Sequence, residues 1–290
     1  MKESAQKIEM DLNRGDFSSL VRSLTPLLDK LLEHDKAKAE YLLKQFDLLT
    51  LDNMPDWGHI LHPVATEIIR QTENGNVKFF DNEDFSWIKE AESLYSEALS
   101  EVLLALTQEE NIPAFQEIQN EQTYLTSDDK WKVIVLKGYG ESIEDNIALF
   151  PSTMKLLNNI PGWVSAMYSI LKPGKKILPH TGVYNGLLRY HLGISVPEKC
   201  AIQIEDEVQG WENGKSLVFD DSFEHSAWNE SDKTRTVLFV DFLRPLPFPM
   251  DILNKWLVLN IFSQSDFIQN AKKNFYKYDS FQKEQVKLIG

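Results

Sequence analysis

The segment FDDSFEHSAW, residues 219–228, places three acidic side chains, a histidine and several large aromatic rings within ten positions. Acidic residues at this density are normal in a solvated turn, but Phe219, Phe223 and Trp228 are residues that prefer burial. A histidine beside carboxylates and a dry aromatic wall has the composition of a metal or proton-transfer site. A single histidine in such a stretch is more often structural than a metal ligand, so the role of His225 depends on the residues around it.

Of the five other histidines, four must be weighed against His225 as candidate ligands. His180 follows a proline in LPHTG, where a strand is expected to end, 45 residues before His225. His59 and His62, in HILH, have the i,i+3 spacing of a chelating pair, but no third ligand is evident nearby, and a structural role is the expectation. His34 lies among charged residues and is expected to be solvated.

Strand alternation places another set of polar residues on one face. In LLRYHLGISV, residues 187–196, Arg189 and His191 point opposite to the apolar residues, and in TRTVLFVDFL Arg235 shares a face with Asp241. Charges on apolar strands are costly unless they are paired. One interpretation is an exposed outer sheet face. Two arginines and a histidine beside a histidine-bearing turn favour the other, an anion-binding barrel mouth.

The elements that carry these residues have a period of two between about 131 and 245. Short runs rich in branched and aromatic residues are bounded by Gly, Pro or Asn, and Asn213-Gly214 in ENGK indicates a hairpin. Many short strands at regular spacing predict a mainly β fold, a double-sheet jelly roll or sandwich. The predicted strands are KWKVIVLKG, WVSAMYSILK, GLLRYHLGISV, CAIQIE, SLVFD and TRTVLFVDFL.

Helical spacing appears on both sides of this region. Apolar residues recur at helical intervals over 17–32, 85–106 and parts of 250–290. We expect a helical extension over 1–75 packed on the core, a β domain with its leading helices over 76–249, and a helical tail over 250–290. The helical ends could instead serve dimerisation or substrate capture.

Composition excludes several classes of protein. The chain has 44 acidic against 30 basic residues and a net charge of −14, which disfavours nucleic acid and anionic membranes as partners. Cys200 is the only cysteine, so no internal disulfide forms, and a reducing compartment is expected. The polar N-terminus lacks a signal core, and WLVLNIF is too short to span a bilayer. A cytoplasmic protein without a membrane anchor is the expectation.

Two segments resemble the aspartyl/asparaginyl β-hydroxylases, a family of Fe(II)- and 2-oxoglutarate-dependent oxygenases. They are YSILKPGKKILPHTGVYNGLLRYHLGISVP (168–197) and GWENGKSLVFDDSFEHSAWNESDKTRTVLFVDFLRP (210–245). The resemblance covers about 130–245, is fainter from 80, and is absent from the first 75 and last 40 residues. It implies a double-stranded β-helix, or cupin-like jelly roll, with flanking helices.

The resemblance also implies roles for six residues. His180 and His225 match the two iron ligands. Arg235 and Ser169 match the residues that bind the distal carboxylate of 2-oxoglutarate, and a planar guanidinium suits a carboxylate better than lysine does. Arg189 and His191 match residues near the metal-chelating carboxylate, in agreement with their shared strand face.

Gly182 stands where many iron oxygenases carry an acidic ligand, and the resembled family lacks that acid too. Water can fill this open metal position, with Asp221 holding it as an acceptor outside the ligand set. Asp220 and Glu224 are expected to cap the turn or to face water. An open position could alternatively admit chloride, as in related iron halogenases.

The implied reaction uses O₂ and 2-oxoglutarate to hydroxylate a C–H bond, with release of succinate and CO₂. We expect a small-molecule, peptide or protein substrate, most of all an Asp/Asn-type or other amino-acid side chain. The alternatives are a halogenase, an acyl-chain hydroxylase and a non-catalytic jelly-roll binding protein. The lack of an anchor argues mildly against a lipid, and the acidic net charge argues weakly against an acidic substrate.

Overall fold

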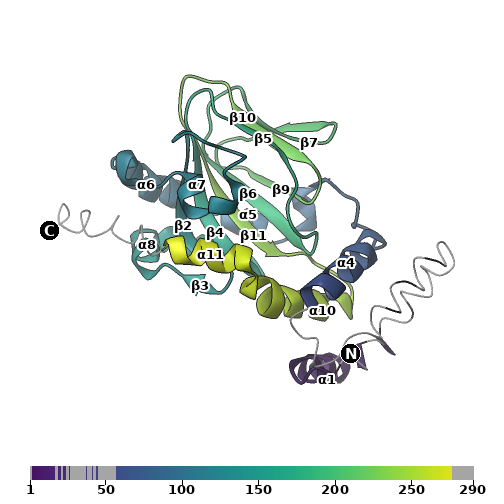
Figure 1. Ribbon diagram of the computed structural model, residues 1–290. Helices are drawn as coiled ribbons and strands as arrows, with labels where there is room; N and C mark the ends of the chain where they lie inside the picture. The colour runs from purple at the N-terminus through teal and green to yellow at the C-terminus, as the bar shows by residue number, and fades with distance from the viewer. Residues whose placement is uncertain are drawn as a thin grey trace. The chain divides into compact units, whose positions relative to one another are not determined.

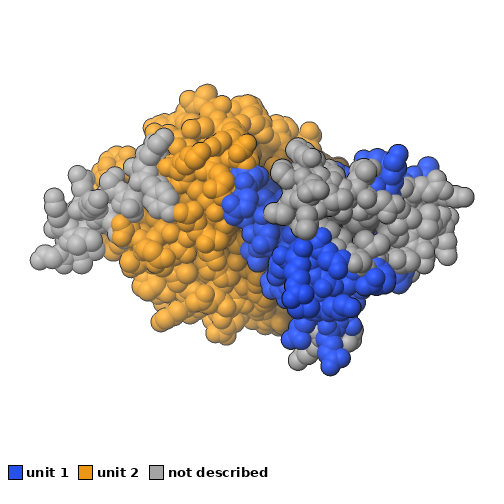
Figure 2. All heavy atoms as spheres, turned by 60° about the horizontal axis from the view of Figure 1, so that its bottom comes forward, with its two compact units in different colours: residues 1–77, 184–186, 243–265 blue, residues 78–183, 187–242, 266–290 orange. Residues whose placement is uncertain are grey.

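The computed structural model describes residues 2–16 and 57–275, with a few isolated positions between 19 and 44. The chain divides into two compact units, drawn in different colours in Figure 2. Unit 1 comprises residues 1–77, 184–186 and 243–265, and unit 2 comprises residues 78–183, 187–242 and 266–290. The expected domain boundaries at 75/76 and 249/250 stay a prediction, and the tail is shared between the two units.

Unit 2 is built on a seven-stranded antiparallel sheet with the order β1-β9-β6-β11-β4-β2-β3 (Figure 1). Its long strands are rich in β-branched and aromatic residues, which suit a pleated surface. Its strands are β1 (Phe79–Phe80), β2 (Trp131–Gly138), β3 (Glu141–Ser142), β4 (Trp163–Leu171), β6 (Leu187–Ser195), β9 (Ser216–Phe219) and β11 (Arg235–Leu243).

A second sheet of four strands has the order β5-β10-β7-β8. Its strands are β5 (Lys176–His180), β7 (Cys200–Ile204), β8 (Glu207–Gly210) and β10 (His225–Asn229). From β4 to β11 the chain passes repeatedly between the two sheets, which is the winding of a double-stranded β-helix. The first crossing is the Pro173-Gly174 turn, where Gly174 has a φ of +71°, a value that favours glycine. The predicted jelly-roll fold is confirmed.

Both faces of the large sheet are buried. One face packs on the helices α5 (Ile88–Ser93), α6 (Tyr95–Leu106) and α9 (Pro151–Asn158) through alternate residues such as Leu188 and Tyr190. The other face looks into the space between the sheets, where Val133, Val237 and Phe219 are buried. Arg189, His191 and Arg235 belong to this inner face, and Arg235 is only 1% exposed. An exposed outer sheet face is therefore the wrong interpretation of these charges.

The remaining described helices belong to one unit or the other. Unit 2 also contains α7 (Phe115–Ile118), α8 (Glu144–Leu149), α11 (Asp266–Phe275) and the 3-10 turns Asn82–Asp84, Glu109–Asn111 and Asn120–Gln122. Unit 1 contains α1 (Lys2–Asn13), α4 (Trp57–Arg70), α10 (Met250–Trp256), the π-helical turn Leu257–Ile261 and the 3-10 turn Phe262–Gln264. Within the described ranges, no helix combines the length and apolar character that a membrane crossing requires.

Three local expectations differ from the structure or lie outside it. The helical pattern over 85–106 breaks at Leu94 into α5 and α6. Asn213-Gly214 closes no hairpin, because β8 belongs to the small sheet and β9 to the large one. The turn instead carries the chain between sheets, and the Asn213 side chain accepts a hydrogen bond from the Val196 backbone at 2.6 Å. The predicted helix over 17–32 falls largely outside the described residues.

Candidate active site

Strand pairing brings the two candidate ligands together. His180 ends β5 and His225 begins β10, and the two residues are direct antiparallel partners in the small sheet. Their ring centroids lie 4.1 Å apart. The 45 residues between them in the sequence are therefore no obstacle to a shared site, because β6 to β9 fold between them.

Both imidazoles are held in the same tautomer. Nδ1 of His180 lies 2.8 Å from the Leu178 carbonyl oxygen, and Nδ1 of His225 lies 2.9 Å from the Phe223 carbonyl oxygen. A carbonyl only accepts, so each Nδ1 carries the proton and each Nε2 keeps its lone pair. Burial lowers the pKa of His180, and burial together with His180 and Arg189 lowers the pKa of His225 to about 3. Two neutral Nε2 donors suit a transition-metal ion.

The Asp221 carboxylate occupies the space beside Gly182. A Cβ atom at position 182 would collide with that carboxylate, and the Gly182 amide donates to the Asp221 carbonyl at 2.7 Å. Burial raises the pKa of Asp221 to about 6, while an ion pair with Arg189 at 2.8 Å opposes this rise. No cluster of three or more His, Cys, Asp or Glu ligands occurs among the residues that the structure describes.

Arg189 is held between two carboxylates. Its Nε donates to Asp241 at 3.0 Å, its other arm reaches Asp221, and its guanidinium stacks 4.0 Å from the Phe239 ring centroid. Asp241 also accepts hydrogen bonds from Tyr139 at 3.1 Å and from Ser165 at 2.8 Å. Strand alternation placed Asp241 on this face but did not identify it as a partner of Arg189.

Arg235 is a buried cation of a different kind. It donates to the Ser169 carbonyl at 3.1 Å and to the Ser169 hydroxyl at 3.4 Å, and it lies 4.6 Å from the Trp211 ring centroid. Its Nε has no hydrogen-bond partner, and no described carboxylate forms an ion pair with it. Burial lowers its pKa to about 9. A buried guanidinium in this state is expected to attract an anion.

His191 presents a second donor without a partner. Trp211 Nε1 donates to its Nδ1 at 3.2 Å, so in the neutral ring the proton lies on Nε2, which is buried and unpartnered. Burial, Arg235, Arg189 and His225 all lower the pKa of His191. Two unsatisfied donors, on His191 and Arg235, thus lie on the inner face of the large sheet, and a ligand with carboxylate oxygens would satisfy both.

A cavity of about 160 Å³ opens from the metal end of the site. His180, Gly182, Arg189 and Asp221 line that end. The polar residues of the remaining lining include Gln119, Gln122, Lys137, Tyr139 and Ser165. The apolar residues come mainly from α7, α11 and the strands β2, β4 and β11, and they are Phe115, Ile118, Trp131, Val135, Ala166, Met167, Val183, Phe239, Phe267, Ile268, Ala271 and Phe275.

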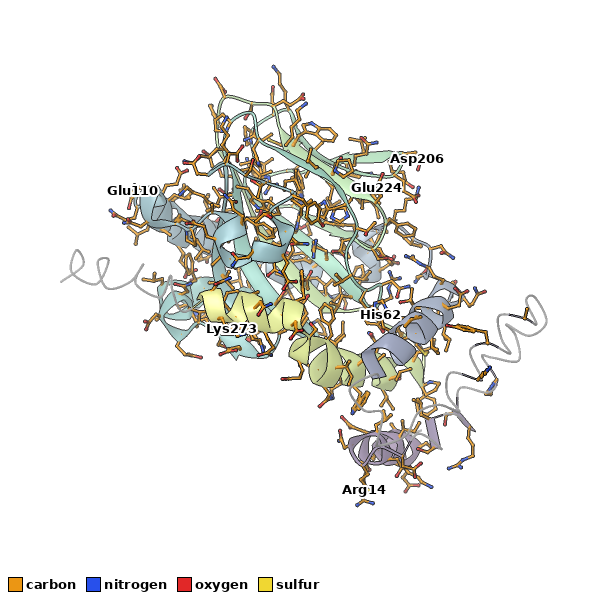
Figure 3. All side chains as sticks on the ribbon, viewed as in Figure 1. Arg14, His62, Glu110, Asp206, Glu224 and Lys273 are labelled. Atoms are coloured by element: carbon orange, nitrogen blue, oxygen red, sulfur yellow. The ribbon has the colours of Figure 1, made fainter. Side chains whose placement is uncertain are left out.

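The other residues singled out in the sequence lie apart from this cavity. Asp220 caps the turn before β10 by accepting from the Ser222 amide at 2.9 Å, as expected. Glu224 is exposed and is drawn among the outer side chains in Figure 3. His62 packs its ring 5.0 Å from that of Tyr184 within unit 1. The side chain of His59 and all of His34 lie outside the described residues.

Several site residues escaped the sequence-based reasoning. Trp211 orients His191 and covers Arg235, and Trp131 donates to the Ser169 hydroxyl at 3.1 Å. Both tryptophans start or precede predicted strands and look like ordinary core residues in the sequence. The alternation of β11 places Asp241 on the same face as Arg235, and this was the one sequence feature that could have identified Asp241 as a site residue.

Comparison with known proteins identifies the family of the chain. Residues 92–245 match the family model for aspartyl/asparaginyl beta-hydroxylase. An ornithine lipid ester-linked acyl 2-hydroxylase from Rhizobium tropici is 39% identical over 214 residues, covering 73% of this chain and 76% of that protein. An aspartyl/asparaginyl beta-hydroxylase from Homo sapiens is 38% identical over 121 residues, covering 40% of this chain and 16% of that protein.

Among solved structures, a cupin domain of an XRE family transcriptional regulator from Enterobacter cloacae is 16% identical, with a TM-score of 0.29. The match covers 40% of this chain and 99% of that one, and it adds nothing to the strand topology described above. The family match, in contrast, spans more than half of the chain and contains all the candidate ligands. The chain belongs to the aspartyl/asparaginyl β-hydroxylase family, a family of hydroxylases.

Proposed function

We propose that this chain is an Fe(II)- and 2-oxoglutarate-dependent dioxygenase that hydroxylates a C–H bond of an acyl chain. The observation that carries the proposal is the pair of Nε2 lone pairs on His180 and His225, set beside two unsatisfied buried donors. A divalent metal needs the first feature, and an anionic cosubstrate needs the second.

The residues present fit the proposed ligands. His180 and His225 would hold the iron, and the Asp221 carboxylate, which fills the space beside Gly182, would orient solvent bound to the metal. Arg235 and Ser169 would bind the distal carboxylate of 2-oxoglutarate. His191 and Arg189 would lie near its other end, and the Nε2–H of His191 would donate to a carboxylate oxygen.

When bound, Fe(II), O₂ and 2-oxoglutarate supply the oxidising chemistry that replaces a C–H bond by C–OH and releases succinate and CO₂. The chain contributes orientation and exclusion of water. Carbonyl contacts fix the rings of both histidines, and Trp211 fixes the tautomer of His191. The aromatic and aliphatic lining keeps the substrate end dry, which prevents loss of the oxidising power to solvent.

An acyl chain fits the cavity better than an Asp or Asn side chain, which was the preferred substrate from sequence. Beyond its metal end the lining is largely hydrophobic, and the cation Arg189 is already neutralised by Asp221 and Asp241. An acidic substrate would therefore meet two carboxylates beside that guanidinium, with Lys137 as the other cation of the lining. The relative with broad coverage acts, by its name, on an ester-linked acyl chain.

The halogenase alternative is disfavoured by Asp221. Its carboxylate lies in the space that a side chain at position 182 would take, and an anion there would repel chloride. The non-catalytic alternative predicts ligand binding without turnover, so an activity assay separates it from the proposal. A cytoplasmic location stays a prediction.

The test is turnover of the purified chain with Fe(II), 2-oxoglutarate and air, following succinate and product mass. The substrate panel contains an ester-linked acyl lipid, an Asp-containing peptide and free aspartate. We expect succinate in step with one added oxygen on the acyl lipid, and neither product from His225→Ala. Oxygen added to the peptide instead would contradict the substrate assignment, and equal turnover by His225→Ala would contradict the metal site.

A further inference from the structure

The floor of the cavity runs across the strands of the large sheet. Val135 on β2, Met167 on β4 and Phe239 on β11 are successive partners in register, and Arg189 on the next strand, β6, stacks on Phe239. From Arg189 to Val135 the floor crosses three strand spacings, about 14 Å. The metal end lies at β6, and the far end lies at β2.

Phe275 closes the far end. It is the last described residue of α11, the yellow helix in Figure 1, and only 7% of its surface is exposed. Its ring rests against the backbone of β2, where a Cβ atom on Gly138 would lie 2.6 Å from the ring. Glycine at 138 therefore makes the room that the ring occupies.

A second, smaller cavity lies behind this ring. It has a volume of about 20 Å³ and shares three lining residues with the main cavity, namely Ile118, Val135 and Phe275. The rest of its lining is largely aliphatic and includes Ile112, Val133 and Ile143. These three shared side chains form a partition between the two spaces.

We infer that Phe275 sets the length of alkyl chain that the site accepts, by stopping the tail at this partition. The inference rests on the proposed acyl substrate and adds the residue that selects among chains. A chain whose reacting carbon lies near His180 extends along the floor towards β2 and meets the Phe275 ring. Longer tails then have to displace a ring that is wedged against Gly138.

Ala271 offers a matched perturbation of opposite sign. It lies one turn before Phe275 on the same face of α11, and it also lines the main cavity. A leucine there would fill space that the chain needs, whereas an alanine at 275 would join the two cavities. The two substitutions should therefore move the limiting chain length in opposite directions.

The experiment measures binding to the metal-free protein, so that it does not depend on turnover. Straight-chain alcohols from butanol to dodecanol are titrated calorimetrically into wild type, Phe275→Ala and Ala271→Leu. Each methylene that enters an apolar site should tighten binding about fourfold, until the tail reaches the end wall. Phe85→Ala, which removes the same side chain from the helix-covered face, serves as the control.

In Phe275→Ala we expect the fourfold steps to continue for roughly two or three more methylenes, because the removed phenyl ring leaves space for about that many. They should end earlier in Ala271→Leu and at the wild-type length in Phe85→Ala. One breakpoint shared by all variants, or no binding by wild type, would overturn the inference. If Phe275→Ala does not fold, Ala271→Leu alone decides, because an unchanged breakpoint there contradicts a closed end wall.

The same proteins separate this inference from the proposed function. If the breakpoints shift but no acyl lipid is turned over, Phe275 still limits the chain length, and the proposed hydroxylation of such lipids is refuted. Turnover of an acyl lipid with unshifted breakpoints would refute the role of Phe275 and leave the proposed function intact.

Discussion

Replacing Arg235 by Met should stabilise the ligand-free protein while it removes cosubstrate binding. The guanidinium is fully enclosed, its Nε has no partner, and burial lowers its pKa from the usual value of an arginine to about 9. At about 1.4 kcal/mol for each tenfold change in acidity, keeping this group charged costs about 5 kcal/mol as an upper bound. Replacing even paired buried charges by apolar side chains is neutral or stabilises other proteins by about 1–4 kcal/mol. We therefore expect Arg235→Met to raise the free energy of unfolding by about 1–3 kcal/mol, after a loss to imperfect packing.

Urea unfolding without metal or 2-oxoglutarate measures this difference, with an unchanged m-value as the sign of unchanged compactness. Arg244→Met is the matched control, because Arg244 is also buried but donates to the carbonyls of Asn185 at 2.7 Å and Asn74 at 2.8 Å. That variant should lose stability. If Arg235→Met lost stability to the same extent, Arg235 would be an ordinary satisfied residue, and the reasoning that it awaits an anion would be refuted.

Two further changes test the rest of the site. Asp241→Asn leaves Arg189 with one carboxylate and should lower the free energy of unfolding by about 2–4 kcal/mol in a urea titration. The exposed Glu224→Gln should stay within about 0.5 kcal/mol of wild type, and an equal loss in both variants would show that the buried network is unimportant. Gly182→Ala should push the Asp221 carboxylate aside and weaken Fe(II) binding by about 10- to 100-fold, measured by anaerobic calorimetry. Wild-type affinity in that variant would contradict a role for Asp221 beside the metal.

Long strands of the large sheet were predictable because their composition is extreme. β4, β6 and β11 are each nine residues long and rich in apolar residues. One face of these strands packs on helices, and the other faces the small sheet. β10 was not predicted as a strand, and for β5 only a strand end at His180 was expected. β5 contains Pro179 and its burial does not alternate. The burial of β10 alternates, but its buried positions are His225, Ala227 and Asn229, so its hydrophobicity does not follow its burial.

The site divides in the same way. Alternation along β6 and β11 placed Arg189, His191 and Arg235 on one face, and this arrangement is confirmed. The ion pair between Arg189 and Asp241 joins residues 52 positions apart, and no local spacing specifies such a contact. The pairing of His180 with His225 rested on the family resemblance, because the register between two short strands is a tertiary property.

The central claim is that two histidines and one arginine form a joint metal and cosubstrate site. The most direct measurement is an anaerobic calorimetric titration of 2-oxoglutarate into protein with and without Fe(II), for wild type and Arg235→Met. We expect tight binding by wild type only when Fe(II) is present, and binding at least about tenfold weaker by Arg235→Met with Fe(II). Binding that is independent of Fe(II), or equal in the two proteins, would contradict the account.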